Sequence, residues 1–382
     1  MQRAAAHRIA CAVVAAEVGR IRETDLPDAG SDWPEDRAIG DEGLGLDSLE
    51  RLGAIGALAE TFGLDDALLG GTPPRSVGDW TNWILRHHAT GGGRLTVHTS
   101  GSKGRPRPCV HALADLLGEA AWLGARFADR RRVVAMVPAH HLYGMIWTAL
   151  LPGALGVPVV VRTIGVALDL AAGDLVVAVP DQWQAMLRLV RRFPADVIGV
   201  TSGGPIDDAI AAELRTAGLS RLIDIYGSSE TSGIAVRDVP AAGYDLLPRW
   251  RLVPLDDSDW QLADGSGVIF PLPDHVERLA DRMLRPVRRR DGAVQVAGHN
   301  VWPERVAEVL RGVDGVADVA VRLHVNGRLK AFVVPDAGQD VAELSRALDQ
   351  AIAAQLTAPE RPKNIRFGAA LPRNAMGKLQ DW

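Results

Sequence analysis

The sequence predicts an α/β protein in three parts: an all-α helical unit, a layered α/β domain and a small α+β domain. Apolar residues follow helical spacing before residue 89. From residue 95, short β-branched runs alternate with helical stretches, which is typical of a mainly parallel sheet covered on both faces. A basic turn near residue 290 precedes a second, shorter alternation. The expected domains are 1–88, 95–290 and 291–382.

The helical unit should contain an apolar first helix, a polar loop, a second helix from about Ser48 and a last helix. In the last helix, Val77, Trp80 and Ile84 are spaced three and four residues apart, which predicts one buried stripe. The run ATGGG at 89–93 is expected to be a linker.

The α/β domain should take its strands from six apolar runs: LTVHT, RVVAMV, VPVVV, DLVVAV, DVIGV and RLIDIY. Residues 142–161 contain no charge over a length that would suit a membrane span. Gly144, Pro152 and Gly156 interrupt this segment, so we expect a helix of about ten residues, a turn and a short strand instead. The small domain should begin its helices at Pro303 and near Asp340.

Charge and cysteine content exclude several classes of protein. The formal charge of -5 would repel a polyanion, so nucleic-acid binding is not expected. Cys11 and Cys109 are far apart and lack metal-ligand spacing, which argues against a disulfide framework or a zinc site. We identify no export signal in the first residues and expect a cytoplasmic protein without a membrane span.

A glycine-rich segment, HTSGSKGRPRP, follows the first expected strand. Backbone amides of such a turn, hydroxyls and nearby cations suit a polyphosphate. A flexible Gly/Ser loop would have the same composition, and the segment is not a Walker A motif. The candidate phosphate-binding residues are Thr99, Ser100, Gly101, Ser102, Lys103, Gly104 and Arg107.

A second polar turn, YGSSET, comes directly after the apolar run RLIDI. One carboxylate, Glu230, stands among hydroxyls there, and this combination can hold a nucleotide phosphate together with Mg²⁺. The candidate residues beside it are Tyr226, Gly227, Ser228, Ser229 and Thr231. Two further polar segments accompany these turns along the chain: PAHHLYG at 138–144 and PRNAMGK at 372–378.

In this order the segments resemble the core motifs of the adenylate-forming superfamily, which holds acyl-CoA synthetases, aryl and fatty acyl-AMP ligases and nonribosomal adenylation domains. HTSGSKGRPRP is similar to its TSGSTGxPK loop, PAHHLYG to PxxHxxG, YGSSET to YGSTET, and PRNAMGK to PxxxxGK. LADR at 279–282 resembles the TGD segment, and RRRDGAVQVAGHNVWPERV resembles the hinge region. The resemblance covers residues 95–382.

The resemblance implies an adenylate-forming large domain, a mobile C-terminal domain and an ATP- and Mg²⁺-dependent reaction. It implies that Lys378, Glu230 and Thr99 are catalytic, with Glu230 also the metal ligand. It implies that the acid pocket is lined by His141, Tyr143 and Gly144, and that Gly203 and Gly204 lie behind the adenine. It also implies that Asp281 holds the ribose hydroxyls and that Asp291 is the hinge. The region before the phosphate loop is shorter than is usual in the family, so the large domain should be truncated.

Other interpretations of these residues remain open. His140 and His141 point in opposite directions from an extended segment, so we expect His140 to pack or cap and His141 to face the acid. An ordinary turn would explain Gly203 and Gly204 equally, and a turn aspartate would explain Asp291. The sequence departs from the family pattern at Lys103, Arg107 and Gln295, and no glycine precedes Asp281.

The helical unit carries a second resemblance. LGLDSLERLGAIGALAETFGL at 44–64 resembles the LGxDSLxxxEL signature of acyl carrier proteins, and SVGDW at 76–80 suits their fourth helix. This resemblance implies that Ser48 bears a phosphopantetheine arm. A capped helix with Asp47 or Ser48 at its N-cap would have the same local sequence.

The expected function is ATP-dependent activation of a small carboxylic acid through an acyl-adenylate, then transfer to a phosphopantetheine thiol. That thiol could belong to the chain's own Ser48, to a separate carrier protein or to CoA. The alternatives are a stand-alone acyl-CoA synthetase with a vestigial carrier-like N-terminus and a non-catalytic interaction protein on a degenerate ligase fold. The sequence does not identify the acid.

Overall fold

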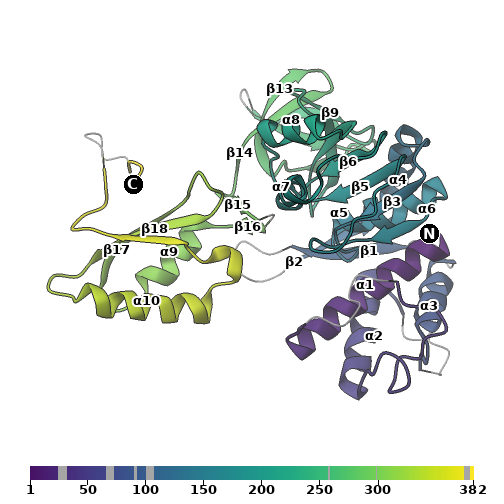
Figure 1. Cartoon of the computed structure of the whole chain (residues 1–382), viewed down its shortest axis with the longest axis horizontal. Helices are drawn as coiled ribbons and strands as arrows, with labels where there is room; N and C mark the ends of the chain where they lie inside the picture. The colour runs from purple at the N-terminus through teal and green to yellow at the C-terminus, as the bar shows by residue number, and fades with distance from the viewer. Residues whose placement is uncertain are drawn as a thin grey trace. The chain divides into compact units, whose positions relative to one another are not determined.

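The structure is a computed structural model of the 382-residue chain (Figure 1). It describes residues 1–24, 32–65, 73–89, 93–99, 107–256, 259–297, 299–373 and 379–382. The chain divides into two compact units, and each is described by itself. The first unit comprises Met1–Thr99, Pro106–Pro271 and Arg278–Arg285; the second includes Leu272–Glu277 and Pro286–Trp382.

Three helices open the first unit: α1 (Arg3–Arg22), α2 (Ser48–Phe62) and α3 (Val77–Ala89). Asp47 is the N-cap of α2 and forms a capping box with Glu50, in which each side chain accepts the other residue's backbone N–H. Val77, Trp80 and Ile84 are fully buried on α3, which confirms the predicted stripe.

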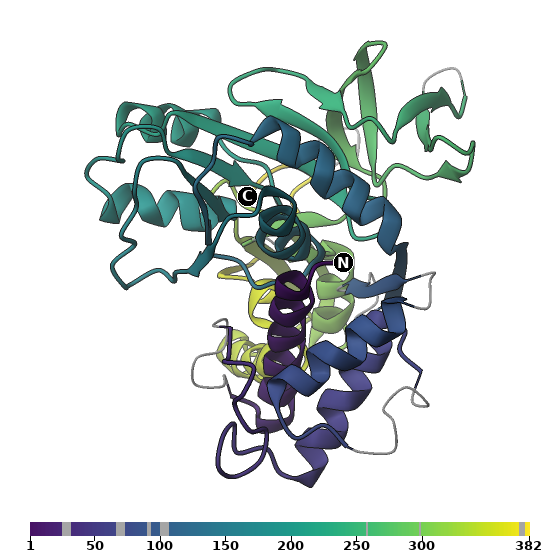
Figure 2. The same cartoon turned by 90° about the vertical axis from the view of Figure 1, so that its right-hand side faces the viewer.

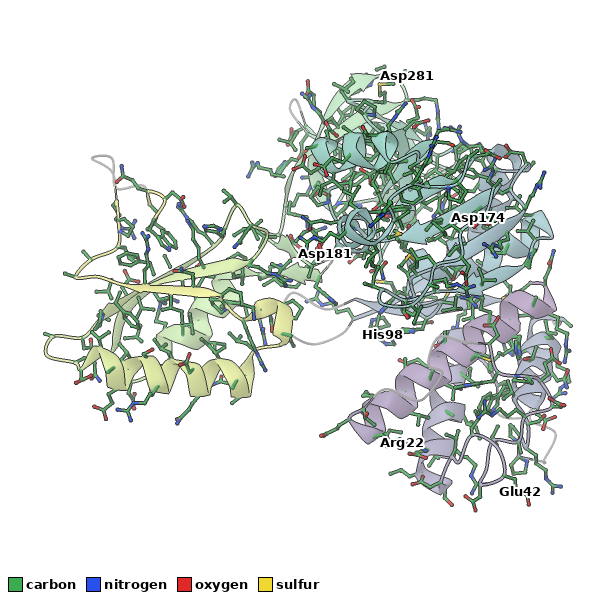
Figure 3. The ribbon with its side chains drawn as sticks, in the orientation of Figure 1. Arg22, Glu42, His98, Asp174, Asp181 and Asp281 are labelled. Atoms are coloured by element: carbon green, nitrogen blue, oxygen red, sulfur yellow. The ribbon has the colours of Figure 1, made fainter. Side chains whose placement is uncertain are left out.

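These helices belong to the same compact unit as the sheet that follows. Helix α1 contacts the π-helical turn η2 (Ile146–Leu150) and α6 (Leu151–Leu155), and α2 contacts β1 (Arg94–Thr99). Figure 2 shows the start of α1 beside this part of the unit. Glu60 at the end of α2 lies 3.0 Å from the ring of His98, which Figure 3 labels.

A nine-stranded sheet forms the centre of the first unit, in the order β13-β14-β9-β8-β7-β6-β5-β3-β4. Strands β7, β6, β5, β3 and β4 are parallel neighbours, whereas β8 and β9 run antiparallel. The bounds are β3 (Arg132–Ala135), β4 (Val159–Val161), β5 (Asp174–Ala178), β6 (Ile198–Thr201), β7 (Arg221–Ser228), β8 (Ser232–Asp238), β9 (Tyr244–Leu246), β13 (Asp274–Ala280) and β14 (Met283–Arg289). Five of the six expected runs form the parallel part of this sheet, but the sheet as a whole is mixed, because β7, β8, β9 and β14 pair antiparallel, and the run LTVHT forms β1 of a separate hairpin.

Helices connect the parallel strands and cover them, which is why β5 and β6 are buried along their whole length. Trp183 fills the core above β6, where its indole N–H donates to the Val200 carbonyl at 3.1 Å. Gly199 leaves it room, because a Cβ there would lie 2.6 Å from the ring. The helices are α4 (Leu113–Arg126), α5 (Leu142–Met145), α7 (Pro180–Leu189) and α8 (Asp208–Thr216).

The uncharged segment 142–161 folds as a helix through α5, η2 and α6, then a turn and β4. No helix among the described residues is long and apolar enough to cross a membrane. Two smaller elements complete the first unit: the hairpin of β1 with β2 (Arg107–Ala112), and a three-stranded sheet of β10 (Arg251–Pro254), β11 (Trp260–Ala263) and β12 (Ile269–Phe270).

The second unit is an α+β fold with its own core. Figure 1 shows α9 and α10 on one face of the sheet β17-β18-β19. Val306 and Leu310 of α9 pack there with Leu344 and Leu348 of α10. The bounds are β15 (Val294–Val296), β16 (His299–Val301), α9 (Pro303–Arg311), β17 (Val316–Leu323), β18 (Leu329–Pro335), α10 (Val341–Gln355), η3 (Ala358–Glu360) and β19 (Asn364–Phe367).

Candidate active site at the carboxyl end of the parallel sheet

The carboxyl ends of the parallel strands bring three of the sequence motifs to one edge of the sheet. Segment 138–144 follows β3, residues 202–204 follow β6, and 226–228 end β7. Hydrogen bonds tie two of these segments to neighbouring strands. The Tyr143 hydroxyl donates to the Ala178 carbonyl at the end of β5 (3.1 Å), and the Ser202 hydroxyl donates to the Ile225 carbonyl in β7 (2.9 Å).

The turn between β7 and β8 is built around one hydroxyl. Ser228 Oγ accepts the backbone N–H groups of Glu230 (3.2 Å) and Thr231 (3.3 Å) and lies 3.0 Å from Thr231 Oγ1. Gly227 is required there, because a Cβ would lie 2.4 Å from the Ser232 carbonyl oxygen. With its backbone fixed and Thr231 buried, the turn leaves the Glu230 side chain exposed.

The hairpin β1–β2 carries the predicted phosphate loop and is tied to this turn. Thr99 and Arg107 are opposite each other where the two strands end. His111 of β2 is buried and donates through Nε2 to the Ser229 carbonyl at 2.8 Å; its burial lowers its pKa. This bond ties β2 of the hairpin to the Glu230 turn, at a point about 14 Å along the strand from Arg107. The loop residues Ser100, Gly101, Ser102, Lys103 and Gly104 lie outside the described residues.

Tyr226, predicted beside the nucleotide, is supported by a buried network. The Asp224 carboxylate accepts the Tyr244 hydroxyl at 2.5 Å and Arg237 Nε at 3.0 Å, and burial raises the pKa of Asp224. Tyr244 packs edge-on against Tyr226, with ring centroids 6.0 Å apart. This arrangement fixes an aromatic ring near the end of β7. Gly203 follows the neighbouring strand β6, and its φ of 84° favours glycine.

The three residues predicted for the acid pocket differ in what they do. Gly144 is required by packing, because a Cβ would lie 2.0 Å from the Pro138 carbonyl oxygen. Tyr143 uses its hydroxyl on Ala178. His141 is exposed and occupies the N-cap position of α5, whereas His140 packs, which is one of the two roles expected for it. His140 is half-buried against the ring of His141, and burial lowers its pKa to about 3.

An apolar cavity of about 200 Å³ lies among α1, α4 and α6. Leu117, Ala120 and Ala121 line it from one face of α4, whereas Glu119 points from the opposite face by helical geometry. The cavity is therefore separate from the edge of the sheet that carries Glu230. Its other lining residues are Gln2, Ala5, Leu150, Gly153 and Ala154.

Asp281, the predicted ribose ligand, lies in the turn between β13 and β14 and pairs with Arg278 at 2.9 Å. The register of β14, β9, β8 and β7 places Met283, two residues after Asp281, level with Ile225 and three strand spacings away, or about 14 Å. Figure 3 shows Asp281 well separated from His98, which adjoins Thr99. The described residues do not group Asp281 with the phosphate-loop hairpin, and its role stays a prediction.

Asp291 and Lys378 belong to the second unit. Asp291 pairs with Arg289 at 2.8 Å and accepts the Ala293 N–H at 3.1 Å, and the division between the units falls five residues earlier, at Pro286. Lys378 lies outside the described residues. The residues on either side of segment 374–378 are joined by a β-bridge between Arg373 and Leu379.

Among the described residues, no group of three or more His, Cys, Asp or Glu side chains could hold a metal ion by itself. A single carboxylate such as Glu230 suits Mg²⁺ that is bound mainly through substrate phosphates. The sequence motifs did not identify His111 or Glu119, although both contact the Glu230 turn.

Comparison with known families decides the assignment. The profile described as AMP-binding enzyme matches residues 95–303, and that described as AMP-binding enzyme C-terminal domain matches residues 305–378. The chain belongs to the AMP-binding enzyme family. It is an ATP-dependent, AMP-forming acid–thiol ligase, with the family's large α/β domain and small C-terminal domain.

Two relatives match nearly the whole chain. A protein of Halorhodospira halophila named 4-coumarate–CoA ligase is 37% identical over 376 residues, covering 95% of this chain and 94% of that one. A protein of the same name from Rhodobacter capsulatus is 38% identical over 400 residues, covering 98% and 99%. The helical unit before the phosphate loop is therefore part of the match, and these AMP-binding enzymes have a similar length.

A solved structure supports the fold. The o-succinylbenzoate CoA synthetase of Bacillus subtilis has a TM-score of 0.58 and 18% identity, and the match covers 75% of this chain and 67% of that chain.

Proposed function

We propose that this AMP-binding enzyme converts an arylpropenoic acid of the 4-coumarate type into its CoA thioester. Relatives named 4-coumarate–CoA ligase are 36% to 38% identical over 93% to 98% of the chain, which supports both the acid class and CoA as acceptor. The observation that carries the adenylation chemistry is the hydrogen bond from His111 to Ser229, because it unites the phosphate-loop hairpin with the Glu230 turn.

In the first half-reaction, a carboxylate oxygen attacks the α-phosphorus of ATP and the bond to pyrophosphate breaks. Donors of the 99–107 loop would hold the phosphates, and Glu230 would hold Mg²⁺ at the turn. Mg²⁺ neutralises charge on the phosphate oxygens when it is bound. Lys378 would approach from the second unit and stabilise the negative charge shared by the carboxylate and the α-phosphate.

In the second half-reaction, the CoA thiolate attacks the acyl carbon and AMP leaves with one of the original carboxylate oxygens. Lys378 must withdraw so that the thiol can enter, and we expect the second unit to turn about Asp291 between the two steps. The proton of the thiol passes to solvent or to the departing phosphate. The acyl-CoA thioester, AMP and pyrophosphate are the products.

The direct test is thioester formation with 4-coumarate, ATP, Mg²⁺ and CoA, measured together with pyrophosphate release. The native chain should release one pyrophosphate per thioester formed. Glu230→Ala and Lys378→Ala should each lower adenylate formation at least a hundredfold, whereas Glu213→Ala, an exposed glutamate on α8, should have no effect. No pyrophosphate release with any acid in a wide panel would favour the non-catalytic alternative.

One observation favours a second candidate, a carrier role for the helical unit. Ser48 is exposed at the first position of α2, and two apolar neighbours, Leu49 and Leu52, are 65% and 66% exposed. Large apolar side chains on the same helical face are seldom left uncovered without a partner. Glu60, which contacts His98 of β1, lies about 18 Å along the helix from Ser48.

Incubation with CoA and a phosphopantetheinyl transferase, followed by intact-mass measurement, tests the carrier role. An added arm that Ser48→Ala abolishes would support it, and thioester formation on that arm would make the chain its own acceptor. An unmodified chain that still acylates free CoA would leave the stand-alone synthetase as the function.

A further inference from the structure

Glu119 of α4 is the second side chain that holds the Glu230 turn. Its Oε2 accepts the Ser232 hydroxyl at 2.8 Å, and the carboxylate also accepts the Gly233 N–H. Helix α4 follows directly after β2, so Glu119 and His111 come from the same stretch of chain. The turn is therefore fixed at Ser229 by one residue and at Ser232 by another.

Ser232 needs this support because its backbone is strained. Its φ of 65° is in the left-handed region, which is strained for any residue other than glycine. The following Gly233 is held from both sides, since its carbonyl accepts the Trp250 indole N–H at 2.7 Å. A Cβ at Gly233 would lie 2.4 Å from Glu119 Oε1, so only glycine allows the carboxylate to approach.

We propose that Glu119 is a positioning residue that keeps Ser232 in its left-handed conformation and thereby presents Glu230 to Mg·ATP. The chain of contacts is short. Thr231 Oγ1 donates to the Ser232 carbonyl at 3.1 Å, and Thr231 also lies 3.0 Å from Ser228 Oγ, which accepts the Glu230 N–H. The inference rests on the proposed role of Glu230. It assigns Glu119 no contact with substrate.

The test compares KM for Mg·ATP with KM for the acid and for CoA. Glu119→Ala should raise KM for Mg·ATP, and the Mg²⁺ concentration giving half-maximal rate, at least tenfold, with the other two KM values within threefold of native. Glu119→Gln keeps a carbonyl acceptor for Ser232 and should stay within threefold of native throughout. Glu213→Ala is the exposed control on α8.

A rescue variant separates positioning from general stability. Glycine adopts a positive φ without strain. The double variant Glu119→Ala, Ser232→Gly should therefore have a KM for Mg·ATP at least threefold lower than that of Glu119→Ala alone. If Glu119→Ala does not fold, Ser232→Ala in the native background should raise the same KM and Ser232→Gly should not.

The inference fails if Glu119→Ala changes all three KM values equally, or if Ser232→Gly gives no recovery. It also fails if Glu230→Ala raises KM for Mg·ATP but Glu119→Ala does not. If instead Glu230→Ala leaves KM for Mg·ATP unchanged, the proposed role of Glu230 is wrong. Glu230→Ala therefore separates failure of the Glu230 role from failure of the Glu119 role.

Discussion

Replacing Glu119 by glutamine should change how the stability of the first unit depends on pH. Burial is the main cause that raises the pKa of this carboxyl from its ordinary 4.5 to about 7, against the opposing hydrogen bonds of Ser232 and Gly233 and the charge of Arg249. Between these two pH values the folded chain keeps a proton that the unfolded chain releases. The free energy of unfolding must therefore fall as pH rises from 4.5 to 7, and then level off.

The magnitude follows from the shift. Each pKa unit corresponds to about 1.4 kcal/mol, so the shift costs the ionised protein at most about 3 kcal/mol above pH 7. Glu119→Gln carries no titratable group there. The difference in unfolding free energy between native and variant should move by about 3 kcal/mol between pH 4.5 and pH 8, in favour of the variant at high pH.

Urea denaturation of the two proteins at several pH values measures this difference, with Glu213→Gln as the exposed control. Taking the difference cancels titrations that the proteins share, including that of His111. A difference that stays constant from pH 4.5 to pH 8, or that moves equally in the control, would refute the reasoning.

Three further predictions concern other parts of the site. Gly144→Ala should destabilise the protein by about 1 to 3 kcal/mol in thermal denaturation, because its Cβ would lie 2.0 Å from the Pro138 carbonyl oxygen; an unchanged midpoint would contradict this. Tyr143→Phe removes the donor to Ala178, so it should cost about 1 kcal/mol in urea denaturation and raise KM for the acid but not for ATP; a change confined to ATP would contradict the acid-pocket role. Ser48→Ala should leave the rate with free CoA unchanged in the thioester assay, and a large loss would contradict a reaction with CoA in which Ser48 takes no part.

Much of the fold could be predicted from the sequence because its signals are local. Dense β-branched runs separated by helical stretches indicate buried parallel strands. Strands β3 and β5 lie within the expected runs, and β6 and β7 begin within theirs and extend one and two residues beyond them. Parallel strands end at the same edge of a sheet. The strand order alone therefore predicts that Ser202, after β6, lies close to the end of β7, which leads to Glu230.

The parts that could not be predicted depend on contacts between distant residues. Ser232 and Glu119 are 113 positions apart, and His111 and Ser229 are 118 apart; no spacing rule pairs a helix residue with a turn at that separation. The positive φ of Ser232 could not be predicted from the local sequence, because serine is common in ordinary turns.

The composition of α1 carries a sequence signal for the packing of the helical unit against the rest of the first unit. Helix α1 buries residues around most of its circumference, including Ala6, Ile9, Val13 and Val14, because α2 and α3 contact it on one side and η2 and α6 on another. An amphipathic helix of a free-standing bundle would keep one polar face. The scarcity of polar residues between Ile9 and Ala16 therefore indicated that α1 is enclosed by more than its own bundle.

The central claim is that an acid is activated as an acyl-adenylate at the Glu230 turn. Oxygen transfer tests it most directly: 4-coumarate labelled with ¹⁸O in its carboxylate is converted with ATP and CoA, and the products are analysed by mass spectrometry. Attack by the carboxylate on the α-phosphorus predicts one ¹⁸O in each AMP and none in pyrophosphate. Unlabelled AMP, or formation of ADP with the ¹⁸O in inorganic phosphate, would contradict the account.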